Sequence, residues 1–288
     1  MTAHSDNPYF NVPPLWEAID LDNEQEALTW TKRLLASGES PISFGPTAHV
    51  SPLELAWRNG YAQVMKLLLS AGATTEIHDD FDVSYCLVKS PFEASRLLLD
   101  RGLDLTKLVY KNQQGDLICD GFNNVLSELL CEDNYEKIQL LRPFGIMVFL
   151  NAFESDLGRS PLCQMAEEEN LKGLLWLIQE GADVNAYCEA TIGPTAIELA
   201  VDTGSIQIVQ ALLDAGANPN IPTWMWKTPV DRVVNYSTTP RKHKHDPENK
   251  PDRVEIRKLI LEAAKRFPPP IYPDGSMPSV WPPLSNCR

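Results

Sequence analysis

The sequence predicts an all-α repeat solenoid, and three observations support that prediction. The chain of 288 residues repeats itself, with matching segments that begin at Ser51, Ser160 and Thr195. The starts at Ser160, Thr195 and Thr228 lie 35 and 33 residues apart. Each start has the residues of a helix N-terminus, and each unit ends in apolar residues followed by a glycine. A unit of this kind cannot bury its apolar face alone, so neighbouring units must stack into one continuous core.

The start of each unit has the chemistry of a helix N-cap. Ser51, Thr195 and Thr228 are N-cap residue types, and an acidic residue follows each of them three positions later. A hydroxyl and a carboxylate at this spacing can each accept a hydrogen bond from an otherwise unpaired amide, as in a capping box. We therefore expect these acids to serve the helices and not a binding site. They are Glu54, Glu198 and Asp231.

The rest of each unit predicts a second helix that ends at a glycine. Apolar residues three and four positions apart form the stripe of that helix. The first helices contain small residues that let neighbouring units approach closely: Ala56, Ala166 and Ala200. The glycines stand where the chain needs a left-handed residue to leave the second helix. They are Gly72, Gly102, Gly181 and Gly216.

The unit as a whole resembles the ankyrin repeat. Its period is near 33 residues, and its letters follow T-P-L-x-x-A at the start and L-L-x-x-G-A-D-x-N at the end. More divergent copies begin near residues 81 and 124. The resemblance implies an ankyrin-repeat solenoid of about seven helix pairs with short β-hairpin tips, followed by a Pro-rich extended C-terminal tail.

We expect three regions along the chain. Residues 1–11 form an N-terminal arm, residues 12–266 form the solenoid with a basic insertion at 237–251, and residues 267–288 form the tail. The tail has seven prolines in 22 residues, so it cannot be helical and is expected to be polyproline-like. The closing helix of the solenoid is expected from about residue 252 to 266. Its apolar positions are Val254, Ile256, Leu259 and Ile260.

The composition excludes several classes of protein. Hydrophobic residues make up 43% of the chain and charged residues 22%, which excludes wholesale disorder. No run of 18 apolar residues occurs, so we expect no membrane partner. The first ten residues are polar and do not resemble a secretory signal. Six cysteines are scattered without a C-x-x-C pair, which predicts reduced thiols and a cytoplasmic location.

Motifs of cofactor and metal chemistry are not found in the sequence. The phosphate-binding loop, the dinucleotide glycine pattern, H-E-x-x-H and G-x-S-x-G do not occur. His243, His245 and Asp246 could ligate a metal ion, but two imidazoles on a polar loop do not make a preformed site. We therefore expect no cofactor and no metal, while no known catalytic motif decides whether the chain is an enzyme.

The charge is distributed unevenly. The formal net charge is −14, yet residues 241–266 hold nine basic and five acidic residues and so carry +4. Residues 267–288 cancel, which leaves −18 for the first 240 residues. An acidic body with a basic patch near its end selects partners by sign. We expect a basic protein partner and no DNA.

The ankyrin resemblance implies that partners meet the hairpin tips and the exposed ends of the first helices. By alignment, the expected binding residues are Arg58, Asn59, Arg159, Glu168, Glu169, Asp202, Trp224, Met225, Trp226 and Tyr236. Within this set the aromatic tip 224–226 has two interpretations. It is either an anchor for a partner or a surface covered by the Pro-rich tail. Trp57 and Trp176 are read as core residues.

Two functions from different classes fit the sequence. The first is a binding module whose acidic concave face recognises a basic partner. The second is an enzyme that resembles fungal arginine-containing cyclodipeptide synthases, which use arginyl-tRNA. It would have an acidic pocket for arginine, and its catalytic residues would be Glu132, Asp133 and Glu136, which approximate a D-D-x-x-E motif. Its tRNA phosphates would meet Arg241, Lys242, Lys244, Lys250 and Arg253. A closed acidic pocket would favour the enzyme, and an open acidic face would favour the binding module.

Overall fold

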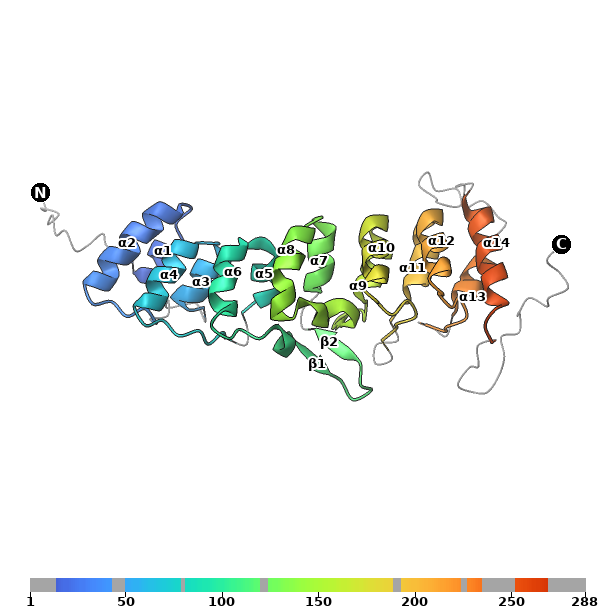
Figure 1. Cartoon of the computed structure of the whole chain (residues 1–288), viewed down its shortest axis with the longest axis horizontal. Helices are drawn as coiled ribbons and strands as arrows, with labels where there is room; N and C mark the ends of the chain where they lie inside the picture. Colours follow the sequence, from blue (N-terminus) through green and yellow to red (C-terminus); the bar gives the residue numbers. More distant parts are fainter. Residues whose placement is uncertain are drawn as a thin grey trace, which may run out of the picture. The chain divides into compact units, whose positions relative to one another are not determined.

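The computed structural model describes residues 14–42, 50–78, 81–119, 124–188, 193–223, 227–234 and 252–268. The chain divides into two compact units, Met1–Asp104 and Leu105–Arg288. Within each unit the helices follow one another in pairs joined by short turns (Figure 1). No described helix is long and apolar enough to cross a membrane. The predicted N-terminal arm, the basic insertion and all of the tail beyond Pro268 lie outside the described residues.

The first unit consists of helices in consecutive pairs. They are α1 (Leu15–Ile19), α2 (Glu24–Ala36), α3 (Pro52–Arg58), α4 (Ala62–Ser70), α5 (Val83–Lys89) and α6 (Phe92–Leu99). The last two are the divergent copy that the sequence predicts from about residue 81.

The second unit begins with a 3₁₀ turn and a hairpin and continues with helix pairs (Figure 1). Its first half contains η1 (Leu105–Leu108), β1 (Val109–Lys111), β2 (Leu117–Cys119), α7 (Val125–Cys131), α8 (Tyr135–Leu141), η2 (Arg142–Phe144), η3 (Ile146–Asn151) and β3 (Phe153–Glu154). Its second half contains α9 (Pro161–Glu167), α10 (Leu171–Gln179), α11 (Ala196–Thr203), α12 (Ile206–Asp214), α13 (Pro229–Val234) and α14 (Asp252–Ala264).

The helix starts have the capping chemistry that the sequence predicts. The Ser51 hydroxyl accepts from the Glu54 amide, while a Glu54 carboxylate oxygen accepts from the Ser51 amide at 2.6 Å. Thr228 and Asp231 make the same reciprocal pair, at 3.1 and 2.9 Å. At Thr195 the hydroxyl accepts from the amide three residues later, but the carboxylate at that position reaches toward the next tip instead. The capping box is therefore confirmed at two starts and is modified at the third.

The fourth residue of a repeat also joins that repeat to the one that follows it. Its side chain bonds to the tip that follows, some 24 to 31 residues later. The bonds are from the His78 amide to the Glu54 carboxylate (2.7 Å), from the Cys163 thiol to the Pro194 carbonyl (3.3 Å) and from the Thr223 hydroxyl to the Glu198 carboxylate. Each bond fixes the register of two neighbouring repeats, because it gives a buried polar group of one repeat a partner in the next.

The first helices pack as closely as their small residues predict. Ala56, Ala166 and Ala200 are completely buried. Trp57 is also completely buried, with its indole nitrogen 3.1 Å from the Ser95 hydroxyl. This ring confirms the core interpretation of Trp57, since its polar group has found a partner inside the unit.

A small three-stranded sheet forms at the tips of the second unit. β1 pairs with β2 in antiparallel fashion, with Tyr110 opposite Ile118, and β2 pairs with β3 in parallel fashion, with Ile118 opposite Phe153. Ile118, Phe153 and Cys188 form a buried cluster. The β1–β2 hairpin is longer than the short tips that the sequence predicts. Its signal is a pair of apolar-rich triplets around the turn Asn112–Asp116, where the Asn112 side chain accepts from two backbone amides.

The closing helix α14 corrects one of the predicted core positions. Ile256 and Ile260 are completely buried, as predicted, but Val254 is 78% exposed. Residues two positions apart in a helix are separated by about 200° around its axis, so Val254 and Ile256 cannot share a face. The buried side instead continues to Ala263 and Ala264, which follow Ile260 at helical spacing.

Candidate protein-binding surface

Acidic side chains gather where the first helix of a pair turns into the second helix in the second unit. We call this set the acidic turns. All of its members are exposed. They are Glu132, Asp133 and Glu136 at the α7–α8 turn, Glu167, Glu168 and Glu169 at the α9–α10 turn, and Asp202 at the end of α11.

Two of these acids stand at backbone positions that normally favour glycine. Asp133 has φ 58° and Glu169 has φ 53°, both in the left-handed region. The corresponding turns of the α3–α4 and α11–α12 pairs use Gly60 and Gly204, with φ 76° and 78°. A residue with a Cβ atom is strained in this region, by about 1–2 kcal/mol, and aspartate tolerates the region better than glutamate does. The chain therefore keeps two acids at exposed turns against a local backbone cost.

Hydrogen bonds hold the α7–α8 and α9–α10 turns beside each other. The Asn170 side-chain amide donates to the Leu130 carbonyl at 3.2 Å, and the Lys172 ammonium lies 2.6 Å from the Asp133 carboxylate. The first unit has an equivalent contact, in which the Asn59 amide donates to the Ile19 carbonyl at 3.1 Å. Asn170 and Asn59 thus align consecutive turns within their own units.

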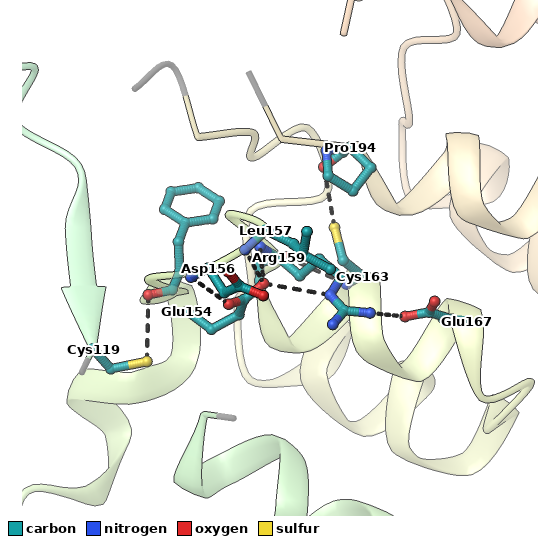
Figure 2. Close-up of polar contacts among 10 residues, drawn as sticks. Cys119, Glu154, Asp156, Leu157, Arg159, Cys163, Glu167 and Pro194 are labelled. Carbon is teal, nitrogen blue, oxygen red and sulfur yellow. Dashed lines mark hydrogen bonds and ion pairs between the residues drawn. The ribbon is translucent and has the colours of Figure 1, made fainter. Parts of the chain in front are cut away.

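The tip before α9 is organised around one buried carboxylate (Figure 2). Glu154 is 2% exposed and accepts from the backbone amides of Asp156, Leu157 and Arg159 at 2.7, 2.8 and 3.3 Å. The Arg159 guanidinium lies between Glu154 and Glu167 and is ion-paired with both (Figure 2). Burial alone would lower the pKa of Arg159. The carboxylates of Glu167 and Glu154 raise it by more, so the net shift of the Arg159 pKa is upward. Arg159, a predicted binding residue, therefore joins the tip to an acidic turn.

A second arginine has the same role near α11. Arg232 on α13 forms ion pairs with Glu198, which is almost fully buried, and with Asp202, at 2.6 Å from the latter. Burial is the largest influence on the pKa of Asp202 and raises it, although 38% of the side chain is exposed. The nearby Arg232 guanidinium acts in the opposite direction and favours the charged carboxylate. Arg232 thus joins the exposed acid Asp202 to the buried acid Glu198.

The other predicted binding residues have different positions. Arg58 is exposed at the end of α3. Arg253 belongs to α14. The remaining candidates lie outside the described residues. They are Trp224, Met225, Trp226, Tyr236, Arg241, Lys242, Lys244 and Lys250.

The acids proposed for an enzyme lie on an exposed turn. Glu132, Asp133 and Glu136 are all exposed, and Asp133 is ion-paired with Lys172. Amide-bond formation needs a site sheltered from water. In the described part of the chain, no group of three or more His, Cys, Asp and Glu side chains could hold a metal ion. The described residues therefore lend no support to the synthase interpretation.

Several surface residues were not among the expected binding residues. Tyr110 on β1 is 48% exposed. Trp176 was expected in the core, but it is only half-buried, and the Arg142 guanidinium lies 5.7 Å from its ring centroid. Lys172 covers the Tyr135 ring in the same way, at 4.3 Å. Helical spacing alone could not distinguish Trp176 from a core residue, because its ring is covered by a cation and by the edge of the Tyr135 ring, 6.1 Å away between centroids.

The geometry defines a class of protein: a solenoid of helix pairs whose tips and turns carry its polar surface. A family model for ankyrin repeats in three copies matches residues 121–223. The chain is 25% identical over 216 residues to the ankyrin repeat and KH domain-containing protein mask-1 of Caenorhabditis elegans. That alignment covers 72% of this chain and 7% of the relative, so the chain spans only a small part of that protein's length.

Two solved structures share the fold. The human ASB11 ankyrin repeat domain has 17% identity and a TM-score of 0.53, with 90% of this chain and 99% of that chain covered. The ankyrin repeat domain of Bcl-3, a member of the IkappaB protein family, has 26% identity and a TM-score of 0.54, with 76% and 92% covered. The chain contains ankyrin repeats and has the ankyrin-repeat fold, as its sequence predicts. Ankyrin repeats in general are protein–protein interaction modules.

Proposed function

We propose that the acidic turns of the second unit bind a basic segment of a protein partner. The observation that carries the proposal is the left-handed backbone at Asp133 and Glu169. Glycine would relieve the strain at both positions, and two other turns of the chain use it. Strain that persists at an exposed site is a mark of function. What Asp133 and Glu169 add to the turns, and glycine would not, is negative charge.

Charge supports the same partner. The chain has a formal net charge of −14, so its field attracts cations over a distance and speeds their encounter. Arginine is the best-matched residue, because its guanidinium binds carboxylates with two parallel hydrogen bonds. A cytoplasmic location belongs to the proposal as well. It rests on the thiols of Cys86, Cys131, Cys163 and Cys188, which form no disulfide and fit a reducing compartment.

A charge reversal tests the proposal. The probe is a fluorescent Arg-rich peptide titrated with the full chain at low and at moderate salt. Replacing Glu168 and Glu169 together with lysine should weaken binding by roughly 1 kcal/mol, or about fivefold, because exposed pairs contribute modestly. Glu93→Lys, on the exposed side of α6 in the first unit, is the matched control and should leave binding unchanged. Wild-type protein that fails to bind the peptide even at low salt would exclude a basic partner.

A further inference from the structure

The three-stranded sheet of the second unit has an open edge at β1. The sheet order is β1-β2-β3, so no strand of the described chain lies on the far side of β1. The hairpin that contains β1 projects beyond the helices of this unit (Figure 1). An edge strand presents a row of backbone amides and carbonyls with which a further strand can pair.

The hydrogen bonds at the hairpin turn show which groups of β1 face outward. The Asn112 amide donates to the Asp116 carbonyl at 3.1 Å, so these two residues are a hydrogen-bonded pair, and Lys111 with Leu117 is the next pair along the ladder. Hydrogen-bonded and non-hydrogen-bonded pairs alternate in an antiparallel ladder. The amides and carbonyls of Val109 and Lys111 therefore point away from β2, and they have no hydrogen-bond partner among the described residues.

An apolar row of side chains crosses the sheet and ends at β1. Tyr110 lies opposite Ile118, and Ile118 lies opposite Phe153, so the three side chains share one face of the sheet. Ile118 and Phe153 are each 5% exposed, whereas Tyr110 at the open edge is 48% exposed. The row thus lacks a member beyond β1. On the opposite face of the strand, the Lys111 side chain is exposed.

We propose that β1 binds an extended segment of a partner protein as an additional antiparallel strand. Val109 and Lys111 can each exchange two hydrogen bonds with a residue of that segment. In such β-augmentation the backbone bonds provide affinity, and the alternating side chains provide specificity. This surface is separate from the acidic turns.

The side chains of β1 define the sequence of the segment. Opposite Lys111 an acidic residue is favoured by its charge, opposite Tyr110 an aromatic residue continues the apolar row, and opposite Val109 a β-branched residue packs best. Because the strands are antiparallel, these residues follow one another in that order, as in Asp-Phe-Val. One acidic residue is enough, since the net charge of −14 disfavours a strongly acidic segment.

The experiment titrates the full chain into a fluorescent peptide, Thr-Asp-Phe-Val-Thr, and compares two N-methylated forms of it. The valine amide of the peptide would donate to the Val109 carbonyl, so N-methylation of the valine should weaken binding by roughly tenfold or more. The phenylalanine amide would point away from β1, and its N-methylation should leave binding unchanged. This pair of peptides tests the backbone pairing without any change to the protein.

Variants of the chain test the same edge. Lys111→Pro removes an outward amide that β2 does not use and should weaken binding by roughly tenfold, whereas Lys111→Ala removes only the charge and should weaken it about threefold. Tyr110→Ala should weaken it about fivefold. Tyr85→Ala, an equally exposed tyrosine on α5 in the first unit, is the matched control and should bind like the wild type. Circular dichroism shows whether each variant is folded.

Hydrogen exchange locates the bound peptide. Binding should slow exchange of the Val109 and Lys111 amides, while the Tyr110 amide, which faces β2, should exchange slowly with and without the peptide. The proposal is overturned if the wild type does not bind the peptide, if the two N-methylated peptides bind equally, or if exchange at Val109 and Lys111 does not change in the complex. The protein with lysine at positions 168 and 169 should bind this peptide like the wild type, which separates the result from that for the acidic turns.

Discussion

Single residues show where this chain departs from an ideal repeat. At the turns of its helix pairs, Gly60 and Gly204 occupy left-handed positions without strain, while Asp133 and Glu169 occupy equivalent positions with strain. The difference lies in one side chain, so stability and binding can be separated by substitution at one position.

Glu169→Gly should make the protein more stable and a weaker binder of basic peptides. Relief of the left-handed strain should raise the free energy of unfolding by about 1 kcal/mol. Urea denaturation measures the first effect, and peptide titration measures the second. Gly204→Ala is the converse control, and it should lower the free energy of unfolding by a similar amount. A Glu169→Gly protein less stable than the wild type would contradict the strain argument.

Cysteine reactivity reports on the same acidic turns. Burial raises the pKa of Cys131 to about 11, with further contributions from Glu128, Glu168 and Glu132. At pH 8 roughly one such thiol in a thousand is ionised, so native Cys131 should react slowly with iodoacetamide although it is exposed. Cys163, completely buried and with its pKa raised to about 11 mainly by burial, should react slowly too.

Glu168→Gln isolates the electrostatic part of this effect. Loss of a carboxylate that raises the pKa of Cys131 should lower that pKa and speed alkylation of Cys131 but not of Cys163. Mass spectrometry after timed alkylation of the native protein gives both rates. Equal rates for Cys131 in the wild type and in Glu168→Gln would refute an influence of the acidic turn on this thiol.

At the scale of elements, the sequence predicts best where one residue type has one physical role. Ser51 with Glu54 could only be read as a helix start, and both of its hydrogen bonds are present. The sequence did not predict the hydrogen bond that Glu198 accepts from the Thr223 hydroxyl, because Thr223 is 25 residues away in the next tip. The sequence predicts short hairpin tips but not the length of the β1–β2 hairpin, because strands of three residues each are too short for a periodic signal.

The closing helix α14 provides a test of which face it buries. Ile256→Ala should lower the free energy of unfolding by about 2–5 kcal/mol, because it removes a completely buried side chain. Val254→Ala, two residues earlier on the exposed face, should change it by less than about 0.5 kcal/mol. Thermal and urea unfolding of the two variants provide the comparison. Equal losses would show that α14 packs on both sides.

At the scale of the whole molecule, the net charge of −14 is the property that the proposed binding of a basic partner depends on most. The sequence predicts an acidic binding face from this charge and from the periodicity of the repeat. The ion pairs of Arg159 and Arg232 were not visible, because they link acids that lie near each other only after folding. Arg159 and Arg232 neutralise part of the negative charge of the acidic turns through their ion pairs with Glu167 and Asp202.

Salt should therefore slow association with a basic peptide more than it speeds dissociation. Raising the ionic strength from about 0.05 to 0.5 M should lower the association rate constant by about tenfold, since screening shortens the range of the field. Stopped-flow fluorescence measures both rate constants. The protein with lysine at positions 168 and 169 should show a shallower dependence. An association rate constant that does not change with salt would contradict electrostatic steering.

The bond between the fourth residue of a unit and the following tip limits how these repeats can be exchanged. Glu54 and Glu198 are buried, and each accepts a hydrogen bond from the following tip (from His78 and Thr223), while Glu54 also accepts from the Ser51 amide of its own repeat. A repeat transplanted alone would bury a carboxylate that has lost a donor, which is among the costliest defects in a protein interior. The segment that can be exchanged intact is thus longer than the sequence repeat, because it includes the tip that follows the repeat. Recombination between repeats should succeed when the crossover follows that tip and fail when it falls before it.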